Sequence, residues 1–237
     1  MLKEELLELE KCLAQVKNPI LSYLDRGIPF DSKKFISELN TLDIKPTQDL
    51  IDLYNWKSGL PEQPFGFNFN LFSGGTFIHY METITTYKTV FQYFGMEFYK
   101  LLPILLHSVL RSEDPVMINL NEESPTYGGI LYYSSMSTPY GPVLVYDSLH
   151  SMIQTIIECY CQNVYFIGEN GELLYEDNEK WNCIRKKFNK EKSYWDEEDN
   201  NNGVLPKEYY DALCQLGMEK KCEGKFVQGI GYIPVSQ

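Results

Sequence analysis

The residue types best suited to metal or nucleophilic chemistry are spread through this 237-residue sequence without a recognisable spacing. The three histidines, His79, His107 and His150, lie near neither one another nor the cysteines. Among the six cysteines, Cys159 and Cys161 are two residues apart and would point to different faces of a helix. No pair has the CxxC spacing of a zinc or redox site. The sequence therefore predicts no metal site and no cofactor.

Catalytic motifs of known type are also missing. The turns written "GENG" and "YGGI" lack the Gly-Lys-Ser/Thr ending of a phosphate-binding loop, and no G-x-S-x-G elbow occurs. His150 follows Asp147 by three residues, which we interpret as a structural or surface arrangement. Glu122 and Glu123 are consecutive, so on a strand they would point to opposite faces. We therefore expect a protein that is not an enzyme, since an enzyme would need a pocket with convergent histidines or carboxylates.

The charge balance favours a partner of the opposite sign. The chain carries 33 acidic and 21 basic residues, a formal net charge of −12 and a pI near 4.8. Phosphate binding needs a basic surface, so neither nucleic acid nor an anionic membrane is an expected partner. The charge favours association with a basic protein, although acidity also serves solubility alone.

No export or membrane signal is recognisable in the sequence. The first residues, "MLKEELLELEK", are charged and amphipathic, and no run of 18 apolar residues occurs. Together with unpaired thiols, these features predict a cytoplasmic protein without a membrane partner.

Apolar spacing and turn signals predict an α+β fold, with a central, mostly antiparallel sheet flanked by helices. Apolar residues three and four apart predict several helices. They are expected over residues 2–24 with a break near Pro19, 46–56, 81–95, 148–162 capped by Ser148, the middle of 177–203, and 206–217. A further short helix is expected within residues 29–43, with Asp31 or Ser32 as its cap. Short apolar runs predict strands over residues 101–109, 114–121, 127–136 and 141–148, and a hairpin over 164–177.

A change of composition divides the chain in two. Residues 1–176 are expected to form a single α+β domain, including the N-terminal helices. Residues 177–237 are more polar and charged, and we expect them to form a helical extension that packs on the domain or trails from it.

The stretch "IKPTQDLIDLYNWKSGL", residues 44–60, resembles the helix-and-turn signature of the SUKH superfamily, a group named after a fungal regulator of cell-wall synthesis. In that family a short helix led by Pro, with Leu or Phe before a Tyr, is followed by an aromatic residue, a small residue and a glycine. The residues that fit are Pro46, Leu50, Leu53, Tyr54, Trp56 and Gly59, with Ser58 where Asn is common. Downstream, "LLPILLHS", "MINLN" and "VYDSLHSMIQTIIECY" follow in the family's order, so the resemblance covers roughly residues 35–165.

The resemblance implies that these signature residues are scaffold. We expect Tyr54 and Trp56 to pack the turn against the sheet, with Pro46 in the first turn of the helix and Gly59 ending it. Tight burial of Trp56 would contribute about 3 kcal/mol to stability. The functional surface would then lie elsewhere on the domain.

The resemblance also implies a function of binding and not of catalysis. Bacterial members are commonly cytoplasmic immunity proteins that neutralise a cognate polymorphic toxin, often a nuclease, whereas fungal members act as signalling or scaffolding partners. The expected function is therefore toxin neutralisation through an acidic surface, and the alternative is a scaffold or regulatory interaction module of the same fold. The candidate contact residues are Glu122, Glu123, Tyr127, Asp196, Glu197, Glu198 and Asp199. Each acidic residue among them can also be read as a solvated charge.

Overall fold

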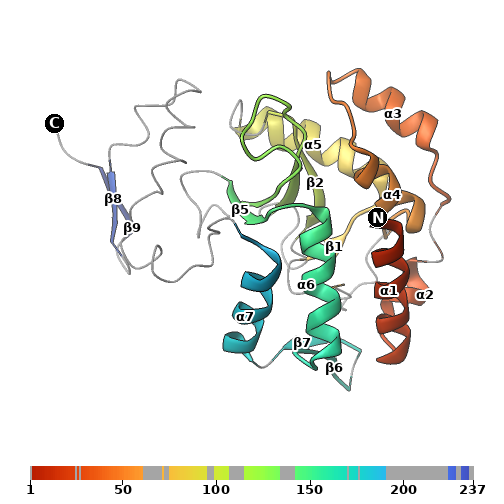
Figure 1. Ribbon diagram of the computed structural model, residues 1–237. Coiled ribbons are helices and arrows are strands. Elements are labelled where there is room, and N and C mark those ends of the chain that lie inside the picture. Colours follow the sequence, from red (N-terminus) through yellow and green to blue (C-terminus); the bar gives the residue numbers. More distant parts are fainter. Residues whose placement is uncertain are drawn as a thin grey trace.

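A five-stranded antiparallel sheet forms the centre of the computed structural model (Figure 1). Its strands pair in sequence order and are β1 (Thr76–Phe77), β2 (Leu101–Leu106), β3 (Pro115–Asn119), β4 (Ile130–Tyr132) and β5 (Val143–Tyr146). The predicted α+β class and the predicted meander are thus confirmed. The structure describes residues 2–24, 26, 28–60, 71, 75–94, 99–106, 115–133, 142–169, 171–175, 177–190, 224–227 and 231–234.

Helices flank this sheet, as the sequence predicts. Those in the described residues are α1 (Leu2–Gln15), α2 (Ile20–Leu24), α3 (Ser32–Asn40), α4 (Gln48–Trp56), α5 (Tyr80–Phe94), α6 (Leu149–Cys161) and α7 (Asn178–Phe188). Helix α1 lies against α4 and α6, and α6 also packs against α7 (Figure 1). Segments from both ends of the domain therefore form one helical layer.

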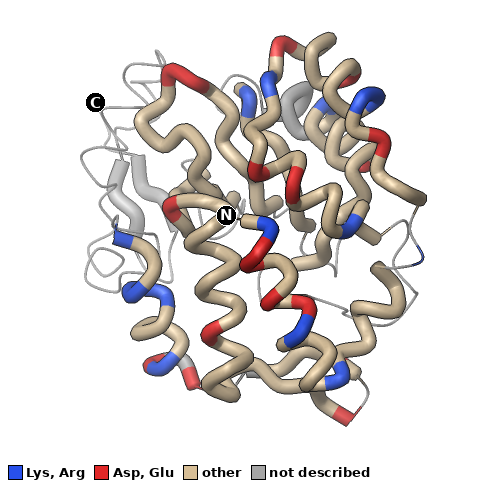
Figure 2. The backbone as a smooth tube through the Cα atoms, turned by 45° about the vertical axis from the view of Figure 1, so that its right-hand side comes forward, with Lys and Arg blue, Asp and Glu red and all other residues tan. Residues whose placement is uncertain are grey.

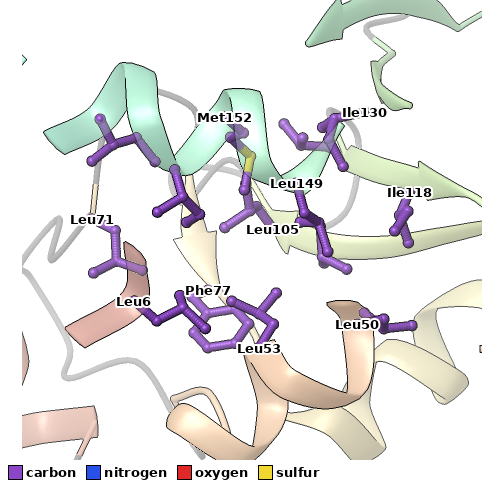
Figure 3. Packing of buried hydrophobic residues seen from close by; sticks show 14 of the residues in the cluster. Leu6, Leu50, Leu53, Leu71, Phe77, Leu105, Ile118, Ile130, Leu149 and Met152 are labelled. Atoms are coloured by element: carbon purple, nitrogen blue, oxygen red, sulfur yellow. The ribbon is translucent and has the colours of Figure 1, made fainter. Parts of the chain in front are cut away.

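The main hydrophobic core lies between the sheet and helices α1, α4, α5 and α6 (Figure 3). Leu102, Val116 and Ile118 face this core from the strands, because alternate side chains of a strand point to the same side of the sheet. They meet apolar residues such as Leu6 of α1 and Met152 of α6. A second, smaller cluster lies on the opposite face and consists of Leu101, Met117, Leu131 and Tyr133.

Several helix ends form where the sequence places them. Helix α1 ends at Gln15 and α2 begins at Ile20, so the chain breaks close to Pro19. Of the two residues proposed to cap α3, Asp31 is the cap, since its carboxylate accepts a hydrogen bond from the Lys34 N–H (3.0 Å). Ser148 caps α6 in a capping box with Ser151.

Helix α4 ends at Trp56, as the sequence predicts, but its start and the role of Gly59 differ from the prediction. Its N-cap is Thr47, whose hydroxyl accepts a hydrogen bond from the Leu50 N–H (3.3 Å), so Pro46 precedes the helix and does not lie in its first turn. The helix ends at Trp56, and the next residue, Lys57, is extended. Gly59 has a φ of +86°, as a backbone reversal requires, but it lies beyond the helix and does not close it.

Tyr54, and not Trp56, is the aromatic residue that anchors α4 in the core. Tyr54 is fully buried and stacks on Phe77 of β1, with ring centroids 5.3 Å apart. Trp56 is half-buried, and its indole N–H donates a hydrogen bond to Glu10 Oε2 of α1 (2.8 Å). The expected tight burial of Trp56 is therefore wrong, because the polar edge of the indole is satisfied at the surface of α1.

The C-terminal part of the chain continues with elements that the structure describes only in part. Strands β6 (Tyr165–Ile167) and β7 (Leu173–Tyr175) form the predicted hairpin, and β8 (Gly224–Val227) and β9 (Gly231–Pro234) form another. Helix α7 packs on α6, and its Ile184 joins the main core. Asn189, just after α7, accepts a hydrogen bond from the Asp147 N–H (3.0 Å). The predicted helix at 206–217 lies outside the described residues, and the division of the chain at residue 176 stays a prediction.

Candidate functional site

The β3–β4 loop, residues 120–129, carries three of the candidate contact residues and is held by one buried side chain. Asn119, the last residue of β3, is 2% exposed. Its Nδ2 donates to Ser124 Oγ (2.8 Å) and to Thr126 Oγ1 (2.9 Å), and its Oδ1 accepts from the Asn121 N–H (2.9 Å). The amide thus uses both of its N–H groups and one acceptor position to fix the loop.

Backbone hydrogen bonds close the same loop at its base. The Gly128 N–H donates to Asn119 O (2.8 Å), and the Asn119 N–H donates to Gly129 O (2.9 Å). Gly129 fits a narrow space, since a Cβ there would lie 2.7 Å from Leu144 Cδ1 and 2.9 Å from Thr126 O. A loop fixed in this way has little conformational freedom to lose when it contacts a partner.

The exposed side chains of this loop contribute little to the stability of the fold. Tyr127 is 43% exposed, and its hydroxyl makes no hydrogen bond within the described part of the chain. Glu122 Oε2 lies 3.7 Å from Lys45 Nζ, but both side chains are largely exposed, so the pair contributes little. The carboxylate of Glu123 has no ion pair among the described residues. The structure thus places Glu122, Glu123 and Tyr127 together on one pre-formed loop.

A partly neutralised carboxylate lies beside the base of the loop, and sequence reasoning missed it. The Leu120 N–H donates to Lys100 O (2.9 Å), and Lys100 Nζ lies 3.0 Å from Asp43 Oδ2. The hydrogen bond and the charge of Lys100 lower the pKa of Asp43, which stays ionised. Asp43 and Lys100 are distant in sequence, so no local pattern predicts this pair.

Acidic residues elsewhere in the described chain are mixed with basic ones (Figure 2). Helix α1, for example, carries four glutamates between two lysines, and its Lys3 lies 3.4 Å from Asp52 of α4. Acidic residues outnumber basic ones only slightly among the described residues, so most of the formal charge of −12 comes from outside them. The predicted acidic contacts Asp196, Glu197, Glu198 and Asp199 lie outside the described residues.

His150 lies between two carboxylates that come from different helices. Its Nδ1 is 2.8 Å from Glu5 Oε2 of α1, and its Nε2 is 3.4 Å from Asp49 Oδ1 of α4. Gln154, one turn along α6, donates to the other Glu5 oxygen (2.9 Å). This arrangement ties three helices together and supports the interpretation of His150 as structural. Sequence reasoning compared His150 with Asp147 and missed Glu5, which is 145 residues away.

His79 is the other histidine within the described residues, and it is buried. Burial lowers its pKa, a shift that the Ile28 backbone partly opposes, so the neutral ring is favoured at neutral pH. Its Nδ1 accepts a hydrogen bond from the Met81 N–H (3.4 Å), while Nε2 makes no well-formed hydrogen bond to a described residue. His107 lies outside the described residues. Across the described chain, no three His, Cys, Asp or Glu side chains are grouped as metal ligands.

No family model matches this chain, and no curated protein matches its sequence. Within the described residues, every helix is too short or too polar to cross a bilayer. The molecule is an α+β protein with an antiparallel meander that presents a hydrogen-bonded, acidic and aromatic loop.

The central role of Asn119 gives a first testable expectation. Asn119→Ala removes three side-chain hydrogen bonds of a buried amide and should lower the free energy of unfolding by about 2 kcal/mol. The amide protons of the β3–β4 loop should exchange faster with solvent, while those of α6 keep their protection. Hydrogen exchange measured by mass spectrometry distinguishes this local loosening from a uniform loss of protection, which would contradict the assigned role.

Proposed function

We propose that this protein is a non-enzymatic immunity protein that binds and neutralises a basic toxin domain. The observation that carries the proposal is the β3–β4 loop, which is fixed by hydrogen bonds to the buried side chain of Asn119. Its Glu122, Glu123 and Tyr127 side chains are exposed and contribute little to the stability of the fold. Because the loop is fixed before binding, ordering it costs little, and more of the contact energy contributes to affinity.

The chemistry of these three side chains suits a basic protein surface. Tyrosine is enriched among the residues that dominate protein interfaces, since it gives a large contact area and a polar tip. The two carboxylates beside it would pair with lysine or arginine, and the formal charge of −12 adds long-range attraction that speeds encounter. A nuclease domain has the required charge, because it must bind phosphates.

The resemblance to the SUKH superfamily supports a toxin as the partner. In that account the signature around α4 serves the scaffold, and the loop on another part of the domain makes the contact. Neutralisation by contact needs neither a cofactor nor turnover, and a cytoplasmic location would place the protein where such toxins act.

Affinity capture with a matched variant tests this proposal. The wild-type chain and the triple variant Glu122→Gln, Glu123→Gln, Tyr127→Ala are used as baits in extracts of the source cells, and captured proteins are identified by mass spectrometry. We expect a basic toxin domain with the wild-type bait only. With the purified toxin, the triple variant should bind about 10- to 100-fold more weakly and fail to suppress toxicity.

The control variant Glu8→Gln, Glu169→Gln removes the same charge from exposed positions outside the loop. It should bind like the wild type, with the small weakening expected from lower net charge. Equal loss in both variants would show that only total charge matters and would contradict a contact at the loop. Capture of signalling proteins in place of a toxin would favour the scaffold alternative.

A further inference from the structure

Two cysteines meet at the contact between α1 and α6. The helices run in the same direction, because Glu5 contacts His150 and Gln154 near their starts, while Cys12 meets Cys161 near their ends. The two Sγ atoms are 3.9 Å apart, although the residues are 149 positions apart in sequence.

Hydrogen bonds on both sides keep the two sulfurs at this distance. Beyond the cysteines, Asn18 Nδ2 donates to the Tyr160 hydroxyl (3.1 Å), which donates to Leu71 O (2.8 Å). Before them, His150 Nδ1 lies 2.8 Å from Glu5 Oε2. A disulfide needs sulfurs about 2 Å apart, so the two sulfurs must approach each other before they can bond.

One of the two thiols is exposed and the other is buried, which suits an oxidation in two steps. Cys161 is exposed and accessible to a small-molecule oxidant, whereas Cys12 is 7% exposed and faces Cys161. Cys159, two residues before Cys161, is fully buried in the core and does not compete. One thiol is thus placed to react first and the other to displace the product.

We propose that Cys12 and Cys161 are a modification site, at which a low-molecular-weight disulfide such as oxidised glutathione forms a disulfide that joins α1 to α6. The Cys161 thiolate attacks the oxidised glutathione, forming a mixed disulfide and releasing one glutathione thiolate. Cys12 then loses its proton to solvent, and its sulfur attacks Cys161 Sγ and releases the second glutathione. Two protein thiols are oxidised, and one glutathione disulfide is reduced to two thiols.

Burial slows the second of these steps. Burial raises the pKa of Cys12 to about 11, and the neighbouring Cys161 and Glu8 add to the shift. The Cys12 thiolate is therefore scarce at neutral pH, which slows its attack. The short distance between the two sulfurs raises the rate of this attack, because the reaction is intramolecular.

The test uses the full chain, reduced and then equilibrated with oxidised glutathione at neutral pH. Peptide mapping under non-reducing conditions should find a linked Cys12–Cys161 peptide with a loss of two hydrogens. The linked protein should unfold at a temperature higher by about 5 °C or more, because the cross-link restricts the unfolded chain. Dithiothreitol should reverse both changes.

Matched variants make the result decisive. Cys161→Ser should abolish the linked peptide and the shift in unfolding temperature, while Cys183→Ser, which alters an exposed thiol on α7, should leave both intact. A glutathione adduct that persists on Cys161, a lack of reaction at equilibrium, or a link between other cysteines would each overturn the proposal. None of these outcomes bears on the toxin-binding proposal, since the loop residues are not altered.

Discussion

Gly59→Ala should destabilise this protein by about 4 kcal/mol, a large loss for a single methyl group. Gly59 has a φ of +86°, which an alanine adopts only with strain. In addition, a Cβ at this position would overlap the Ile78 carbonyl oxygen and approach His79 Cα to 2.7 Å. The obstacle is backbone, so it cannot rotate away as a side chain would.

Relief of this overlap would break the link between the α4 turn and the sheet. The Leu60 N–H donates to Phe77 O (2.9 Å), and the Tyr80 N–H donates to Ser58 O (3.1 Å). Both hydrogen bonds hold the chain around Gly59 against the residues that an added methyl group would displace. We therefore expect the loss to appear as global destabilisation in denaturant unfolding.

Gly128→Ala is the matched control for this prediction. Gly128 has a similar φ of +80°, but a Cβ there would have no neighbour within 4 Å. Its cost should be limited to backbone strain, about 1 kcal/mol. The difference between the two variants therefore isolates the steric effect at Gly59, and equal losses would show that the close approach to Ile78 is not significant.

Tyr54→Ala should cost about 4 kcal/mol, because it empties the centre of the aromatic cluster. The ring of Tyr54 stacks on Phe77 with centroids 5.3 Å apart and contacts Phe35 at the same distance. The residue is fully buried, and burial raises the pKa of its hydroxyl, which stays protonated beside Thr83 Oγ1 at 2.6 Å. A cavity of this size cannot be refilled by small movements of its neighbours.

Two further variants divide this effect into its parts. Tyr54→Phe keeps the ring and removes one hydrogen bond to Thr83, so about 1 kcal/mol should be lost. Trp56→Ala should cost about 2 kcal/mol, less than Tyr54→Ala, because Trp56 is only partly buried. Thermal or denaturant unfolding measures all three, and a larger loss at Trp56 than at Tyr54 would contradict the observed division of roles.

The candidate site was predictable only in its local part. Glu122, Glu123 and Tyr127 lie within six residues of one another in a stretch with turn composition, so any fold of that stretch keeps them close. The role of Asn119 could be suspected from an asparagine that ends an apolar run. Its three hydrogen bonds, however, depend on how the loop turns back over the end of β3.

Most helices and strands of this protein could be predicted from the sequence, because they depend on neighbours along the chain. Apolar spacing defined α1 and α6, Pro19 marked the break before α2, and Ser148 marked the start of α6. Short apolar runs with turns between them predicted the antiparallel pairing of β2 to β5, since short connections leave few other ways to pair.

Contacts between side chains on different elements could not be predicted in this way. Tyr54 and not Trp56 entered the core, and the carboxylate partner of His150 came from α1, 145 residues away. The approach of Cys12 to Cys161 likewise required the first and sixth helices to pack in parallel. A local pattern defines which face of a helix is apolar, but the partner of that face depends on the packing of the whole chain.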